Sequence, residues 1–468
     1  AKRITQMMPA KALYKVSAST KLDYRISITS KEGLATIMNQ KAAPSNITPG
    51  LFIGIDWADQ EHDCYIIDAH GNGQHQTFKQ TPEAIEQWVD QMRSLAGEKP
   101  IAIMIEQSKG PLIYALMFRP DIALYPVNPK QLARYRESYP GGDSKNDPSD
   151  ARYIARMLRE RIGTLKPWIA DDEETRRLAN LSEQRRKIVN GQVAQRQQLM
   201  AHLKSYFPLL LEIFGNRSQL ALLLAMLGRW SDPRELRRAD RQLVDRVLRE
   251  QGIRKQSDRD KLLARIRSSK LLTNDAAIIE PLSMVCQLLG QQIEASRKSI
   301  AAFDQQIAEA LKKHSDGKLF TSLRGAGPTL AARLLCAFGS QKDRWKDADE
   351  VASFAGIAPV TRQSGKSRVV HQRWACPTYL KQTFHEFADS ARKWCPWSKA
   401  RYRQLRDRGI KHNAAIRKLA RSWIRILFRM WKTGEQFDCE RYLTGLLRRN
   451  PELANYLPKS QKNASPNP

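Results

Sequence analysis

Two short apolar runs that each end in a carboxylate constrain the fold of this chain most strongly. Residues 51–55 (LFIGI) are followed by Asp56, and residues 101–105 (IAIMI) are followed by Glu106. Runs of this length and composition predict buried strands. Carboxylates placed where buried strands stop can meet at one edge of a sheet, so we expect these two side chains to lie close together.

A second pair of carboxylates lies in the segment KNDPSDA, where Asp147 and Asp150 are three residues apart. Pro148 is typical of the first turn of a helix that Asp147 opens, and the spacing puts both carboxylates on one helix face. Each could instead act only as a helix cap or as a first-turn residue that complements the helix dipole. Asp143 is a rival that we rank behind Asp147.

Taken together, the four carboxylates favour a site for a hard divalent cation, Mg²⁺ or Mn²⁺. Asp56 alone could be a turn residue at a strand end, and Glu106 alone could be a salt-bridge partner. Two ions about 4 Å apart could activate an attacking oxygen and stabilise a leaving one. The combination therefore indicates chemistry on phosphodiesters.

The charge of the chain points to a polyanionic partner. Its 78 Lys and Arg against 48 Asp and Glu give a formal charge of +30, although a solvated basic surface is the alternative. Six scattered cysteines without a CxxC spacing argue against a zinc ribbon or a disulfide framework. Without a signal-like or membrane-spanning apolar stretch, we expect a cytoplasmic protein with no membrane partner.

The N-terminal third of the chain, up to residue 165, predicts an α/β domain. After a basic N-terminal extension over residues 1–49, whose role is open, strands are expected at 51–56, 64–69 and 74–79, followed by alternating helices and strands. This order is that of the ribonuclease H/RuvC-like fold, which we assign to residues 50–165. The predicted later elements are a helix at 82–95, a strand at 101–106, a helix at 111–118 and a strand at 122–127.

Residues 166–317 predict a helical region with two long helices. In the first, over 171–207, Val189, Val193 and Met200 share one side with Leu203 and Phe207. The second carries a heptad-like seam, typical of an antiparallel or intersubunit coiled coil but also of ordinary packing within one subunit. Its residues are Cys286, Leu289, Ile293, Ser296, Ile300, Phe303, Ile307 and Ala310. A basic insertion over residues 216–275 would contact a polynucleotide or present a solvated face.

Residues 318–447 predict a mainly α C-terminal domain, followed by a polar tail over 448–468. Residues 319–339 (LFTSLRGAGPTLAARLLCAFG) are helix-hairpin-helix-like, or form an ordinary tight turn between helices. Further on, an apolar stripe that includes Ile416, Leu419, Trp423 and Ile426 indicates an amphipathic helix.

Seven segments in this order resemble one known family. They are GID at 54–56, IEQSKG at 105–110, NPKQLARYRES at 128–138, KNDPSDA at 145–151, LRGAGPTLAARLL, ASFAGIAPVTRQSGKS and RKLARSWIRIL. The chain is similar, over most of residues 51–443, to the DEDD transposases of bacterial insertion sequences, which are related to the Piv DNA invertases.

The resemblance implies a RuvC-like domain joined through a coiled coil to a transposase domain with an essential serine. It assigns metal binding and catalysis to Asp56, Glu106, Asp147 and Asp150, and the nucleophile to Ser364. It further implies donor and target DNA, a bridge RNA as guide, and a homo-oligomer in which dimers assemble into a tetramer. The expected location is the nucleoid of the bacterial cytoplasm.

Ser364 lies in a polar, Gly-containing loop where Arg362, Lys366 and Arg368 could hold a scissile phosphate. Its hydroxyl has no His or Asp beside it in sequence, so activation would come from elsewhere, with the metal as the natural candidate. By composition alone it could be a turn serine that bonds to its own backbone, and Ser367 is a rival.

We therefore expect a recombinase that cuts and rejoins DNA through a covalent serine–DNA intermediate. A RuvC-like nuclease or junction resolvase would need only the carboxylates, and an inactive nucleic-acid-binding protein would need neither site. The hydrolase gives no role to the serine loop or to the long C-terminal region.

Overall fold

The computed structural model describes residues 48–107, 109–139, 147–215, 219–365 and 367–458, with Asp147 in its helix but without a described side chain. The chain divides into two compact units, of which the first ends at Ala170 and the second begins at Asp171. Most of the predicted N-terminal extension and the end of the polar tail fall outside the described residues.

The first unit contains a five-stranded mixed sheet. Strands β1 (Leu51–Asp56), β2 (Glu61–Asp68) and β3 (Gly73–Lys79) are antiparallel neighbours, while β4 (Ile101–Ile105) and β5 (Ile122–Pro126) extend the sheet parallel to β1. The strand order is β3-β2-β1-β4-β5. The α/β architecture predicted from the sequence is thus confirmed, although β2 begins three residues earlier than expected.

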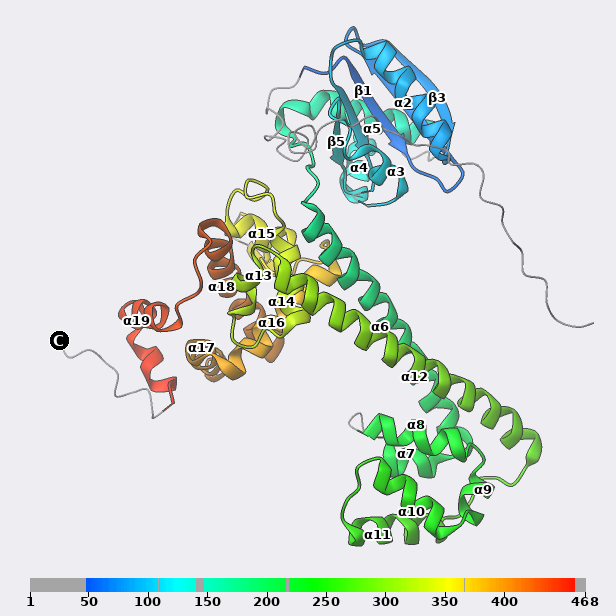
Figure 1. Ribbon diagram of the computed structural model, residues 1–468. Helices are drawn as coiled ribbons and strands as arrows, with labels where there is room; N and C mark the ends of the chain where they lie inside the picture. The colour runs from blue at the N-terminus through cyan, green and yellow to red at the C-terminus, as the bar shows by residue number, and fades with distance from the viewer. Residues whose placement is uncertain (1–47, 108, 140–146, 216–218, 366, 459–468) are drawn as a thin grey trace, which may run out of the picture. The chain divides into compact units, whose positions relative to one another are not determined.

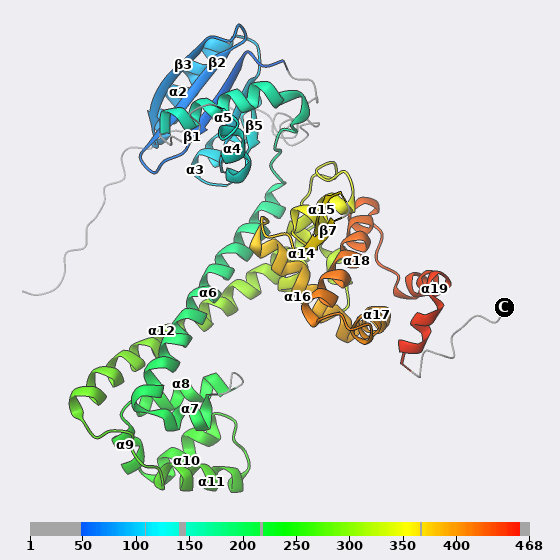
Figure 2. The same ribbon diagram turned by 180° about the vertical axis from the view of Figure 1, so that it is seen from behind.

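Helices cover both faces of this sheet (Figures 1 and 2). One core contains Ile53, Ile55 and residues of α2 (Pro82–Ala96) and α3 (Pro111–Leu116). The alternate residue Phe52 joins the other core with α4 (Pro129–Arg136) and α5 (Asp147–Arg161). Because both faces are buried, β1 and β4 carry apolar runs rather than alternating ones. The 3₁₀ turn η1 (Ile162–Thr164) follows α5.

The second unit is built on two long helices, α6 (Glu173–Tyr206) and α12 (Ala276–Lys313), which lie side by side (Figures 1 and 2). Thr175 near the start of α6 contacts His314 just after α12, with 2.9 Å between Oγ1 and Nε2, whereas Gln195 contacts Gln292, so the pair is antiparallel within one chain.

The predicted seam of α12 is partly buried and partly half-buried. Cys286, Leu289, Ile293 and Ile307 are buried, while Ser296, Ile300, Phe303 and Ala310 are half-buried. The apolar side predicted for α6 is partly wrong, since Val193 is 46% exposed whereas Leu199 is buried. Polar groups such as Arg185, which contacts Asp304 at 2.6 Å, occupy part of the α6 face towards α12, so the buried stripe is not the most apolar one.

Five shorter helices form a module between α6 and α12 (Figure 1). They are α7 (Pro208–Phe214), α8 (Leu220–Arg229), α9 (Pro233–Arg238), α10 (Arg241–Glu250) and α11 (Gln256–Arg267). Their apolar side chains share one core with Leu203 near the end of α6 and Ile279 near the start of α12. The basic insertion expected from the sequence is therefore a packed helical module.

The remainder of the second unit is mainly helical, as predicted. Its helices are α13 (Gly317–Thr321), α14 (Pro328–Phe338), α15 (Ala348–Phe354), α16 (Thr378–Trp394), α17 (Pro396–Asp407), α18 (His412–Thr433), α19 (Cys439–Arg449) and the 3₁₀ helix η3 (Pro451–Tyr456). The predicted stripe of α18 is buried, with Ile416, Leu419, Trp423 and Ile426 all below 9% exposure. None of the helices in the described part of the chain is long and apolar enough to cross a membrane.

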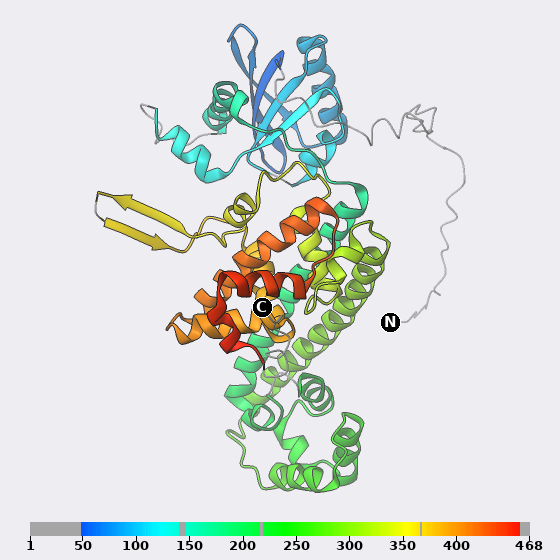
Figure 3. The same cartoon turned by 90° about the vertical axis from the view of Figure 1, so that its left-hand side faces the viewer.

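Two turns interrupt the helices of this part. The segment with the helix-hairpin-helix-like pattern forms α13, a turn and α14; the turn residue Gly325 has φ of 91°, and its carbonyl accepts a hydrogen bond from Ser390. Between α15 and α16, strands β6 (Val360–Ser364) and β7 (Ser367–His371) form a hairpin that projects from the helices (Figure 3).

Candidate functional site

Asp56 and Glu106 come to the same edge of the sheet. In the parallel pair β1–β4, Ile55 lies opposite Ile105, so each carboxylate follows a matched position. Side chains alternate along a strand. Asp56 therefore shares the face of Gly54, which packs under α5, and both carboxylates are half-buried. The expectation that two strand-end carboxylates lie at one sheet edge is met.

Helix α5 begins at this edge. It crosses β1 at Gly54, where an added Cβ would lie 2.3 Å from the Ala151 carbonyl oxygen. At its other end Arg159 lies against Gly71, in the turn after β2, whose end pairs with the start of β1. Helix α5 therefore runs antiparallel to β1, and its first turn, with Asp150, lies towards the edge of the sheet that carries Asp56.

Asp150 is held by an arginine that the sequence interpretation did not select. The side chain of Asp150 is only 7% exposed, and its carboxylate accepts a hydrogen bond from Arg136 in α4, with 2.6 Å between Nη1 and Oδ1. The run RYRES in a helical segment was the only signal for this partner. The side chain of Asp147, and the whole of Asp143, fall outside the described residues.

The donor set fits a hard cation in kind, because carboxylate oxygens are the ligands that Mg²⁺ prefers. Within the described part of the chain, however, no three Asp, Glu, His or Cys side chains form a cluster that could hold a metal ion. The fold brings Asp56, Glu106 and Asp150 to the same side of one sheet edge but not into one cluster. Asp150 is paired with Arg136.

Ser364 ends strand β6 at the exposed end of the hairpin (Figure 3). It pairs with Ser367 in the ladder, and Gly365 in the turn between them has φ of 53°, a conformation that favours glycine. The serine was expected in an irregular polar loop, so its place in a strand differs from that expectation; the polar run TRQS carries no strand-like alternation.

Two of the three basic residues expected around Ser364 can be placed. Arg362 in β6 and Arg368 in β7 are exposed, and Arg368 lies opposite Gln363, next to the serine. Lys366 falls outside the described residues. In the described part of the chain no side chain hydrogen-bonds to the Ser364 hydroxyl, so the hairpin itself supplies no general base.

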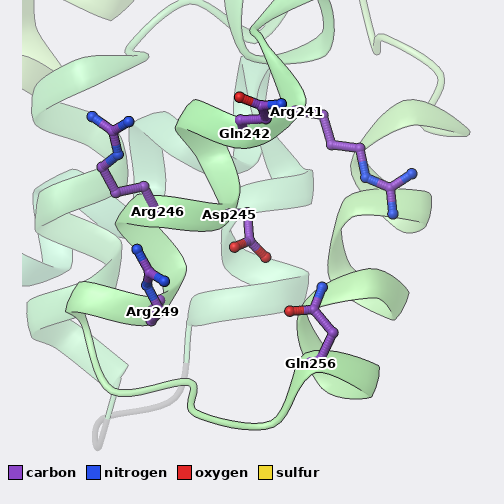
Figure 4. Close-up of a pocket in the computed structure, with 6 residues that line it drawn as sticks. All are labelled: Arg241, Gln242, Asp245, Arg246, Arg249 and Gln256. Carbon is purple, nitrogen blue, oxygen red and sulfur yellow. The ribbon is translucent and has the colours of Figure 1, made fainter.

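A basic depression of about 450 Å³ lies on the helical module (Figure 4). Asp245 in it is neutralised by the buried Arg259 at 2.7 Å, and Arg241 is paired with Asp260 at 2.8 Å. Among the described residues Arg246 and Arg249 have no carboxylate partner, which leaves the depression positive. Its lining residues are Arg241, Gln242, Asp245, Arg246, Arg249 and Gln256.

Two family models match the chain. A transposase model for DEDD proteins of the IS110 type matches residues 53–208, and a model for transposases of the IS116/IS110/IS902 family matches residues 317–403. The two matches include the strand-end carboxylates, α5 and the β6–β7 hairpin. Residues 209–316, which hold most of the helical module and all of α12, lie between them.

Proteins of several insertion elements are similar to this chain over more than four fifths of its length. The candidate transposase of the IS117 mini-circle of Streptomyces coelicolor is 27% identical over 407 residues, which cover 85% of this chain and 98% of that protein. A protein of insertion element IS116 from Streptomyces clavuligerus is 26% identical over 83% of this chain and 96% of its own length. A protein of IS900 from Mycobacterium paratuberculosis is 26% identical, with 81% and 95% covered.

Proposed function

Because the chain belongs to the IS110 family of DEDD insertion-sequence transposases, we propose that it cuts and rejoins DNA through a covalent link between Ser364 and a backbone phosphate. The observation that carries this proposal is the place of Ser364. It stands at the exposed end of a projecting hairpin, flanked by Arg362 and Arg368, where a phosphodiester can reach its hydroxyl.

The proposed reaction is a pair of phosphoryl transfers. The Ser364 oxygen forms a bond to phosphorus while the bond to one deoxyribose oxygen breaks; the serine loses its proton and the leaving hydroxyl gains one. A hydroxyl of a second strand then attacks the same phosphorus and releases the serine. Each step exchanges one phosphoester for another, so no external energy source is needed. Arg362 and Arg368 would hold the non-bridging oxygens, since guanidinium groups match phosphate geometry.

We place the divalent cation, Mg²⁺ or Mn²⁺, among Asp56, Glu106, Asp147 and Asp150. When bound, such an ion stabilises charge on an attacking or leaving oxygen, a need that follows from the absence of a base beside Ser364 among the described residues. Arg136 would fix the orientation of the Asp150 carboxylate. Because the serine and the carboxylates come from different units, neither set is expected to support strand exchange alone.

The likeness to the family extends the proposal to its partners and assembly. We infer donor and target DNA as substrates, a bridge RNA as guide, and a ribonuclease H/RuvC-like topology for the sheet. The antiparallel pair of α6 and α12 is the proposed coiled coil through which dimers and then a tetramer form in the bacterial nucleoid. The net charge of +30 supports polyanionic partners of either kind.

The test is capture of the covalent intermediate on labelled DNA that carries the element's ends. Wild-type protein should form an adduct that survives denaturation, and Ser364→Ala should form none. Ser367→Ala, which changes the paired serine of the same hairpin, is the matched control and should keep the adduct. Asp56→Asn should also lose it, because the carboxylates are assigned to the same step.

Two outcomes would contradict the proposal. Strand joining by the Ser364→Ala protein would exclude the serine intermediate. Cleavage by the wild type without any adduct, lost in Asp56→Asn but not in Ser364→Ala, would instead indicate a metal-dependent nuclease or junction resolvase.

A further inference from the structure

A group of cations gathers at the base of the β6–β7 hairpin, at the end opposite Ser364. Lys381 in α16 donates a hydrogen bond from Nζ to the Arg373 carbonyl at 3.1 Å, and its ammonium lies 5.6 Å from the centre of the Trp374 ring. Arg417 in α18 donates to Gln372 Oε1 at 3.1 Å. We call Arg373, Trp374, Lys381 and Arg417 the hairpin-base cluster.

The cluster has positive charge without a carboxylate to balance it. In the described part of the chain no Asp or Glu forms an ion pair with Arg373, Lys381 or Arg417. The contrast on α18 itself is direct, because Arg421 and Arg425 both reach Asp349, at 3.0 and 3.4 Å. Like charges held close together are unfavourable unless an anion joins them, so the cluster is arranged for a negatively charged ligand.

Unsatisfied buried nitrogens give a second indication at the same place. Three buried nitrogens, Arg373 Nε, His371 Nε2 and His385 Nε2, are inaccessible to solvent and have no hydrogen-bond partner among the described residues. Unpaired buried polar atoms are uncommon in proteins and call for an explanation; beside cations that have no carboxylate partner, a bound anion supplies one. Burial is the main cause that lowers the pKa of His385 to about 4, and the nearby charges of Arg417 and Lys381 contribute to the same shift.

Trp374 supplies the aromatic part of the cluster. It is 77% exposed, although several other tryptophans, such as Trp397, Trp423 and Trp431, are buried in the core. Exposed aromatic rings beside basic side chains are the usual platform on which proteins stack unpaired bases, because every base has a π-face. An indole next to an anion site of this kind matches a base and its adjacent phosphate.

We propose that the hairpin-base cluster binds the DNA strand on which Ser364 acts, with a backbone phosphate at Arg373, Lys381 and Arg417 and an unpaired base stacked on Trp374. The identity of the strand rests on the proposed function. His371 is paired with Val360, four residues before Ser364, which is roughly 13 Å at about 3.3 Å per residue. A strand that runs along the hairpin can therefore reach both the cluster and Ser364.

The test measures binding of the full-length protein to three labelled probes, namely fully paired DNA, the same DNA with an internal mismatch bubble, and single-stranded RNA. Trp374→Ala should weaken binding of the bubble DNA by roughly 5- to 100-fold and affect paired DNA little, while Trp374→Phe retains most of the affinity. Arg417→Gln should reduce the slope of log affinity against log salt by about 1.

Arg429→Gln is the matched control, because it removes the same charge from an exposed position of α18 that lies twelve residues from Arg417. It should leave the bubble affinity and the salt slope unchanged. Circular dichroism and melting of each variant establish that it is folded, and neutralising single phosphates by ethylation should locate the contact that Arg417→Gln no longer makes.

The inference is wrong if the Trp374 and Arg417 variants are folded and bind all probes like the wild type, even when the Ser364 adduct forms. It is also overturned if the losses are confined to the RNA probe. Conversely, the Trp374 and Arg417 variants could lose affinity for bubble DNA as expected while the wild type forms no Ser364 adduct. That result would support this binding site and contradict the proposed serine chemistry.

Discussion

Gly54 shows how one missing side chain positions the carboxylates. An added Cβ would lie 2.3 Å from both the Ala151 carbonyl oxygen and the Ala155 amide nitrogen, which is well inside contact distance and against backbone that cannot turn aside. The absence of a side chain therefore lets α5 press directly onto β1. This close approach sets where the first turn of α5, with Asp150, meets the sheet edge that carries Asp56.

We expect Gly54→Ala to push α5 away from β1 and to lower the free energy of unfolding of the first unit by about 1–3 kcal/mol, the usual cost of overpacking. Urea unfolding followed by tryptophan fluorescence measures the change. Gly163→Ala is the control, since a Cβ there meets no atom of the described residues within 4 Å. An unchanged midpoint for Gly54→Ala would show that α5 does not pack as closely as described.

Among the elements, most of the helical module lies between the segments that the two family models match. Three of its five helices, α9 to α11, span residues 233–267, which hold twelve Lys and Arg against six Asp and Glu. The buried Arg259 in α11 forms an ion pair with Asp245. It also donates hydrogen bonds to the carbonyls of Ile253 and Arg254 in the turn after α10. Arg246 and Arg249, which have no carboxylate partner among the described residues, line the basic depression (Figure 4).

If this face contacts a polynucleotide rather than only water, Arg246→Gln combined with Arg249→Gln should weaken binding and reduce the salt slope by about 2, at about 0.9 per phosphate. Filter binding at several salt concentrations gives the slope. Arg265→Gln removes a charge that is already paired with Glu212 at 2.6 Å and should have little effect. Equal, small effects of all three substitutions would favour the solvated-face interpretation.

At the scale of the whole molecule, the chain consists of two units with separate cores. The apolar side chains around the sheet belong to the first unit, and those around Leu178, Phe338 and Trp431 to the second, which also contains the core of the helical module. Units with their own cores usually unfold as separate cooperative units. Proposed metal ligands and the proposed nucleophile are therefore distributed over two independently stabilised parts.

Calorimetric unfolding should accordingly show more than one transition, and Gly54→Ala should lower the temperature of one transition only. Limited proteolysis should cut first near the boundary between Ala170 and Asp171. One cooperative transition that shifts as a whole in the variant would mean that the two units do not unfold independently.

Local patterns predicted a substantial part of the fold and of the candidate site. The strand at 51–56 and the helix from residue 82 were predicted with almost the observed bounds, because burial on both faces and a helical repeat leave clear traces in a short stretch. For the same reason the predicted apolar stripe of α18 is confirmed as buried. The strand-end positions of Asp56 and Glu106 required nothing beyond their place after apolar runs.

The contacts between distant residues could not be predicted in the same way. Arg136 and Asp150 are fourteen residues apart, and nothing in either segment selects the other. Cys395 and Cys439 show no paired spacing, yet their sulfurs lie 3.3 Å apart as free thiols. The buried side of α6 was partly misassigned because ion pairs and amide contacts with α12, not apolar periodicity, line part of that side.

The sequence by itself determined the α/β order of the first unit, the ends of strands where carboxylates stand, and the basic character of the chain, because these depend on local periodicity and composition. Only the tertiary structure decided that Arg136 holds Asp150, that Ser364 ends a projecting hairpin, and that Arg373, Trp374, Lys381 and Arg417 meet at its base. The physical reason is that such groups are joined by packing between elements distant in sequence, and no local repeat records which elements will meet.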